Sequence, residues 1–123
     1  MQEKMKLPLD DIPVGRTSRE VRILARLFDG FANATRLSIL LLLAREGEMR
    51  VGDLVEQVGA PQPRVSDHLR SLAQCGFVQA RREGRHAYYS ITDWRVLEVL
   101  RLAHNGLQEY REELIACDVL QDR

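Results

Sequence analysis

Residues 51–72 read VGDLVEQVGAPQPRVSDHLRSL, and their pattern predicts two helices joined by a short turn. The first half carries apolar residues at helical spacing and stops at Gly59, a residue that favours a helix C-terminus. Pro61 starts a second helix, and Pro63 still lies in its first turn, where a missing amide hydrogen costs nothing. Two helices joined through Gly59 and Ala60 have the spacing of a helix-turn-helix.

Two short strands are predicted directly after this motif. Residues 77–82 and 86–91 alternate in the period-2 manner of strands, and Glu83, Gly84 and Arg85 stand between them as a turn. A hairpin with arginines at its tip in this position predicts a wing. The expected fold class is therefore mainly α with a small β-hairpin wing, a winged helix-turn-helix.

Two helices are predicted before the motif and one after it. Thr17 or Ser18 can cap the first, and Asn33 can cap the second, whose residues 39–44 are apolar nearly all round and so belong in the core. The last helix runs from about residue 94 to 117 behind Asp93. Its apolar residues follow a heptad seam: Val96, Leu100, Ala103, Leu107, Tyr110, Leu114 and Cys117. Because this seam exceeds what one small domain covers, we expect a homodimer built from the first and last helices.

Composition fits one globular domain: 123 residues, 45% hydrophobic and 29% charged. No apolar run approaches the ~20 residues of a membrane span, and the N-terminus lacks a secretory signal, so we expect a cytoplasmic protein without a membrane partner. The net charge is zero, yet residues 61–89 hold five arginines against two carboxylates. Arginine suits phosphates and guanine edges, although genomic base composition explains an arginine bias equally well.

The second helix of the motif exposes side chains that are nearly all hydrogen-bonding types. Such side chains read base edges in the major groove, whereas hydroxyls and arginines hold phosphates and a wing adds cations beside them. The predicted DNA-binding residues are Gln62, Pro63, Arg64, Ser66, Asp67, His68, Arg70, Arg81, Arg82, Arg85 and His86. An ordinary solvated helix face explains the helix alone but leaves the adjacent arginine-rich hairpin unexplained. We therefore expect double-stranded operator DNA as the partner.

These assignments divide the chain into an N-terminal arm (1–17), a DNA-binding and dimerisation domain (18–117) and a C-terminal tail (118–123). Two other classes of function remain to be weighed. A winged helix can bind a protein partner without any DNA output, but the cationic wing argues against it. An enzyme would rest on Cys75 and His68, which two helical turns separate by ~10 Å, whereas a thiolate–imidazole pair needs ~3 Å. We expect no enzyme.

Four segments of the chain resemble the ArsR/SmtB family of bacterial winged-helix repressors. They are FANATRLSIL (31–40), VGDL (51–54), QPRVSDHLRSL (62–72) and CGFVQARREGRHAYY (75–89), and the resemblance covers about residues 24–108. The resemblance implies a homodimeric repressor that leaves its palindromic operator when an inducer binds. The inducer in this family is commonly a thiophilic or borderline metal ion.

The sequence departs from the family's familiar metal sites. Members that sense arsenic, cadmium or lead carry a Cys-x-Cys where this chain has Arg50 and Gly52. Zinc-type members carry an Asp and a His, then a His and a Glu, in the last helix. The matching residues here are Asp93, Arg95, Gly106 and Glu109, so both imidazoles are missing and a tetrahedral zinc cage is not expected.

Two cysteines resemble part of a third kind of family site. Cys75 matches one ligand, Ser71 replaces another, and Cys117 falls close to a third. Since thiolates suit soft metals, Hg(II), As(III) or Cd(II) held by Cys75 and Cys117 is the predicted inducer, and no other cofactor is expected. Redox chemistry, a small molecule, no input at all, or a purely structural role for both thiols are the alternatives.

Overall fold

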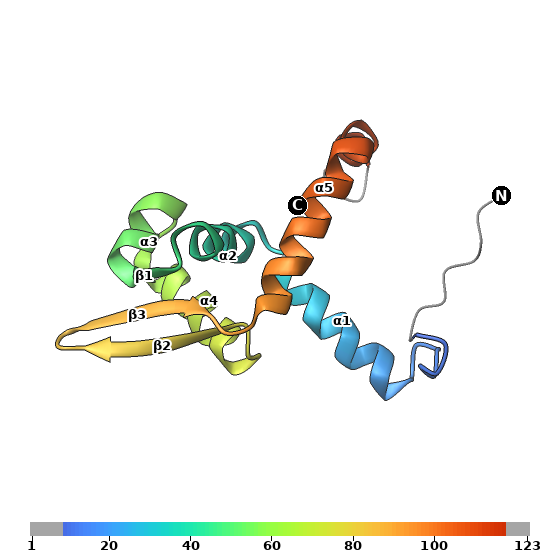
Figure 1. Ribbon diagram of the computed structural model, residues 1–123, viewed down its shortest axis with the longest axis horizontal. Helices are drawn as coiled ribbons and strands as arrows, with labels where there is room; N and C mark the ends of the chain where they lie inside the picture. The colour runs from blue at the N-terminus through green and yellow to red at the C-terminus, as the bar shows by residue number, and fades with distance from the viewer. Residues whose placement is uncertain (1–8, 118–123) are drawn as a thin grey trace.

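The computed structural model describes residues 9–117. In chain order the elements are α1 (Arg19–Phe31), α2 (Ala34–Glu46), β1 (Glu48–Arg50), α3 (Val51–Val58), α4 (Gln62–Gln74), β2 (Val78–Glu83), β3 (His86–Ile91) and α5 (Trp94–Ile115). Helices α2, α3 and α4 form the body, the β2–β3 hairpin projects from one end, and α1 extends from the other (Figure 1). The predicted winged helix-turn-helix is confirmed. Residues 118–123 of the predicted tail lie outside the described residues, as do the first eight of the predicted arm.

Side-chain caps set three of the helix starts. Ser18 accepts a hydrogen bond from the Val21 amide, and Asn33 accepts one from the Thr35 amide at 2.9 Å. Asp93 caps α5 in the same way. Between α3 and α4, Gly59 adopts a left-handed conformation with φ of 78°, which glycine reaches without strain. The helix-turn-helix therefore forms where local sequence signals placed it.

The core lies around α2. Its Ile39, Leu40 and Leu43 are fully buried, as expected for a helix that is apolar nearly all round. They pack with buried side chains from the other elements: Met49, Leu54, Val65, Leu69, Leu72, Phe77, Val78 and Leu100. Within residues 9–117 no single helix is long and apolar enough to cross a membrane, and α1 and α2 meet that test only as a pair bent by 77°.

The wing is part of a three-stranded antiparallel sheet in the order β1-β3-β2. Strand β1 was not predicted, because three residues are too few to show a strand period and the strand exists only through pairing with β3. The predicted turn is also shorter than expected. Glu83 pairs with His86 in the ladder, which leaves Gly84 and Arg85 as a two-residue turn with Gly84 at φ 63°.

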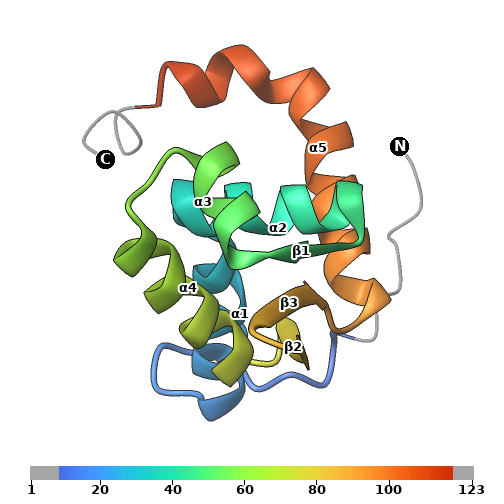
Figure 2. The same cartoon turned by 90° about the vertical axis from the view of Figure 1, so that its left-hand side faces the viewer.

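Helix α5 differs from the straight helix predicted to residue 117. It ends at Ile115 and bends at Tyr110, whose backbone (φ −116°, ψ 17°) is not helical. Around the bend, Tyr110 and Leu114 of α5 line a groove with Leu37 and Leu41 of α2, and the last turns lead away from the first part of the helix (Figure 2). The heptad seam is therefore broken after residue 110. Leu100, predicted to belong to the dimer seam, is buried in the core of its own chain.

Candidate nucleic-acid interface

A shallow hollow of about 380 Å³ lies where the helix-turn-helix meets the wing. Its lining comes from five elements and the wing turn: Arg50, Val51, Gly52, Gln62, Ser66, Arg82, Arg85, His86 and Ala87. The hollow is bordered by three guanidinium groups and an imidazole, and no carboxylate belongs to the lining. The fold thus presents hydrogen-bonding groups of α4 and cations of the wing on one continuous surface.

Helix α4 exposes most of the predicted residues. Gln62, Pro63, Arg64, Asp67 and Arg70 are exposed, and Ser66 is half-buried in the hollow. Arg70 pairs with Asp67 at 2.9 Å, and both side chains are about two-thirds exposed. A pair this open to water is weak, so Arg70 keeps its ability to turn to another anion.

His68 takes a different position from the one predicted. Its Nδ1 lies 3.4 Å from Nη1 of Arg36 in α2, whose other nitrogens donate to the carbonyls of Asp29 and Gly30 at the end of α1. Burial lowers the pKa of His68, and the neighbouring guanidiniums of Arg36 and Arg64 lower it further. His68 therefore joins α4 to the end of α1 through Arg36, and its role as a DNA contact stays a prediction.

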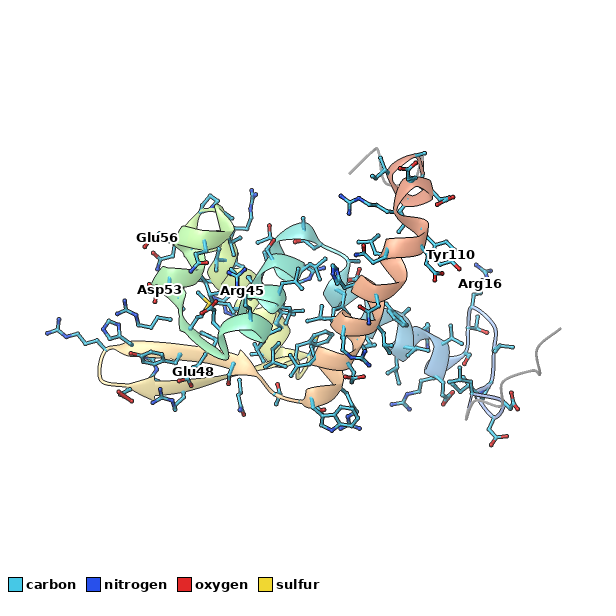
Figure 3. All side chains as sticks on the ribbon, turned by 45° about the horizontal axis from the view of Figure 1, so that its top comes forward. Arg16, Arg45, Glu48, Asp53, Glu56 and Tyr110 are labelled. Atoms are coloured by element: carbon cyan, nitrogen blue, oxygen red, sulfur yellow. The ribbon has the colours of Figure 1, made fainter. Side chains whose placement is uncertain are left out.

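The two neighbouring arginines of β2 face opposite sides of the sheet. Arg81 lies opposite Tyr88 and Arg82 opposite Ala87, so their side chains alternate. Arg81 reaches across the Tyr88 ring (4.8 Å) to Glu48 of β1, with contacts of 2.8 and 3.1 Å. Figure 3 labels Glu48 at the sheet. Only Arg82 lines the hollow.

Arg81 is held by a second carboxylate as well, at 2.6 Å from Glu83. These hydrogen bonds raise the pKa of Arg81, and the bond from Arg81 lowers the pKa of Glu48. The charge of Arg81 is thus already matched within the sheet, and its role as a DNA contact stays a prediction.

Arg50 belongs to the hollow, although it was not among the predicted DNA-binding residues. It ends β1 and stands at the N-cap of α3. In the family resemblance, Arg50 stands only at a position where metal-sensing members carry a cysteine. A basic residue immediately before the first helix of a helix-turn-helix is the signal that would have marked it.

The two cysteines are not brought together within one chain. Cys75 is exposed at the C-cap of α4, and Cys117 is half-buried just beyond α5. The C-terminal ends of these helices lie at opposite edges of the molecule (Figure 2). Among residues 9–117 no three His, Cys, Asp or Glu side chains are grouped to hold a metal ion.

The position of the zinc site in the resembling family holds an ion pair. The Arg95 guanidinium donates hydrogen bonds to both carboxylate oxygens of Asp93 at 2.5 to 3.1 Å. The Asp93 carboxylate also accepts a hydrogen bond from the Arg95 backbone amide. These bonds lower the pKa of Asp93 to about 2. A guanidinium therefore stands where a metal ion would need an imidazole.

A helix-turn-helix with a cationic wing defines the class of this protein, a winged helix-turn-helix transcriptional regulator. The model of the bacterial regulatory protein arsR family matches residues 33–80. The arsenic resistance transcriptional regulator ArsR1 of Pseudomonas putida is 30% identical, over 84% of this chain and 94% of the relative. The probable mercury resistance operon repressor of Streptomyces lividans is 46% identical over 79 residues, 64% of this chain and 62% of the relative.

Solved structures agree with these sequence relatives. Rv0081 of Mycobacterium tuberculosis has a TM-score of 0.74 and 30% identity, over 81% of this chain and all of that one. The homodimeric winged helix-turn-helix domain of Mb0332 from Mycobacterium bovis has a TM-score of 0.69 and 33% identity, over 82% of this chain and 95% of that one. The chain belongs to the ArsR family of DNA-binding transcriptional regulators, which are not enzymes.

Proposed function

We propose that this chain is a cytoplasmic repressor that binds a palindromic operator as a homodimer and leaves it when an inducer binds. The observation that carries the proposal is the hollow in which α4 and the wing share one cationic surface. Gln62 and Arg64, in the first turn of α4, read base edges in the major groove. Phosphates are held by Ser66, Arg70, Arg82 and Arg85.

Exposed apolar faces on α1 and α5 support the homodimer. Helix α1 has no buried residue, and its Ile23, Leu24, Leu27 and Phe28 are all 40% exposed or more. Seam residues of α5 line an open apolar groove of about 430 Å³ against Leu37 and Leu41 of α2. A second copy covers this surface in the proposed dimer, and two-fold symmetry then calls for a palindromic operator.

The proposed inducer is a soft metal ion, Hg(II), As(III) or Cd(II), bound by Cys75 and Cys117. The names of the mercury and arsenic relatives support this choice. Because the ends of α4 and α5 lie at opposite edges of one chain, the two thiols of a shared site come from different protomers. The alternative inducers, from which the test must distinguish a metal ion, are an oxidant and a small organic molecule.

A paired substitution on β2 tests the DNA interface. We expect Arg82→Ala to weaken binding to the chain's own promoter fragment and to reduce the slope of log affinity against log salt by about one. Arg81→Ala is the matched control, because it removes the same charge from the opposite face of the sheet and should leave that slope unchanged. Fluorescence anisotropy at increasing KCl concentrations measures both.

A separate substitution on α4 tests recognition of the DNA sequence. Arg64→Ala should cost about 1–3 kcal/mol of binding free energy and relax the sequence preference, because it removes a base contact and not a phosphate contact. If Arg64→Ala and Arg82→Ala both bind as wild type does, the interface lies elsewhere. If wild type binds no duplex at all, the protein-interaction alternative replaces the repressor.

A further inference from the structure

Arg50 occupies the junction of three elements that the proposed DNA complex must hold together. It is the last residue of β1 and the N-cap of α3, and its side chain reaches toward β3. Its Nη1 lies 3.4 Å from Nε2 of His86, and its Nε lies 3.5 Å from the Asp53 carboxylate. Both contacts exceed the 2.7–2.9 Å of a good charge-assisted hydrogen bond. The Arg50 guanidinium therefore keeps donors for another acceptor.

Arg81, in contrast to Arg50, has a guanidinium whose charge is matched by close carboxylates. It touches two carboxylates at 2.6 to 3.1 Å, and its pKa is raised accordingly. Arg82 and Arg85 pair with no carboxylate within residues 9–117, and Arg50 has only its 3.5 Å contact with Asp53. Three under-neutralised guanidiniums thus border one hollow, which is an arrangement that attracts an anion.

The remaining lining suits an anion with several oxygens. The Ser66 hydroxyl and the His86 imidazole supply further hydrogen-bonding groups at the sides of the hollow. Gly52 leaves open space on α3, since a Cβ there would meet no atom within 4 Å. The backbone of α3 can therefore be approached closely by a tetrahedral group.

We propose that Arg50 and His86 clamp one phosphodiester of the DNA backbone at the point where the helix-turn-helix meets the wing. This inference rests on the proposed function and adds Arg50 to its contacts. The guanidinium donates two hydrogen bonds to one phosphate, and the imidazole beside it donates a third, so a single phosphate ties α3 to the wing. Because every duplex offers this phosphate, the clamp contributes affinity without sequence preference.

The test compares Arg50→Ala with Arg45→Ala in the full-length chain. Arg45 is an exposed arginine at the end of α2 that pairs with Glu46 at 3.0 Å and does not line the hollow. Anisotropy is measured between 50 and 200 mM KCl, a range over which phosphate contacts lose affinity steeply, on the promoter fragment and on an unrelated duplex of equal length. We expect Arg50→Ala to weaken both duplexes by the same factor and to lower the salt slope by about 0.9.

Arg50→Lys is a second variant that distinguishes loss of the charge from loss of folding, since it retains the positive charge. It should restore the salt slope but only part of the affinity, because lysine is a point charge without the planar fork. An Arg50→Ala slope equal to that of Arg45→Ala overturns the clamp and leaves the proposed function standing. A wild-type chain that binds neither duplex overturns both proposals.

Discussion

A glycine at the end of α1 fixes the spacing between this helix and the start of the wing. A Cβ on Gly30 would lie 2.6 Å from Cζ of Phe77 and 3.1 Å from its Cε atoms. Phe77 is only 4% exposed, and its ring meets Phe31 edge to face at 5.0 Å. Carbon atoms in good contact are about 3.5–4.0 Å apart, so in Gly30→Ala the ring must move by about 1 Å.

Two opposing effects set the size of the change. Alanine gains about 1 kcal/mol over glycine inside a helix, whereas overpacking a well-packed core costs about 1–3 kcal/mol. We therefore expect Gly30→Ala to lower the free energy of unfolding by up to about 2 kcal/mol. Gly52→Ala in α3 is the control, since its new methyl group meets nothing within 4 Å. It should leave the free energy of unfolding unchanged or raise it by up to about 1 kcal/mol.

Urea unfolding at one fixed protomer concentration measures these differences, because a dimer's stability depends on concentration. Phe77→Leu and the double variant Gly30→Ala/Phe77→Leu complete a double-mutant cycle. The clash predicts that Gly30→Ala costs less when the ring is absent. A Gly30→Ala chain as stable as Gly52→Ala, or a cycle without coupling, would refute the reasoning.

Four further substitutions test the dimer, the His68 contact and the inducer. Leu107→Glu should release monomers in sedimentation, because it buries a carboxylate in the proposed interface; an unchanged dimer places the interface elsewhere. His68 has a lower pKa in the folded chain than in the unfolded chain, so at pH values below ~6.5 the unfolded chain binds a proton at His68 more readily. The free energy of unfolding therefore falls on acidification. His68→Gln should make that fall smaller in urea titrations at pH 7.5 and 5, and an identical fall argues against a lowered pKa of His68 in the folded chain. Cys75→Ser and Cys117→Ser should each abolish release of DNA by Hg(II), As(III) or Cd(II) in gel shifts, and a wild-type response from both contradicts the thiol site.

The helix-turn-helix, the wing and the central helix could be predicted from the sequence, because the signals for these elements are local. Gly59 stops α3, Pro61 precedes α4, and Asn33 and Asp93 cap α2 and α5. Apolar periodicity then fixes which face of each element is buried. The exposed face of α4 and the arginines of the wing were readable for the same reason.

Which of those side chains already have partners within the chain is visible only in the tertiary structure. Arg81 meets Glu48 from 33 residues away, and His68 meets Arg36 from 32 residues away, so neither partner is visible in a local pattern. The heptad seam likewise predicts which residues share one face of α5, but not which surface packs against that face. In the fold α5 bends at Tyr110, and its seam residues line a groove with α2. Contacts between distant segments depend on how the helices pack, and packing is a property of the whole core.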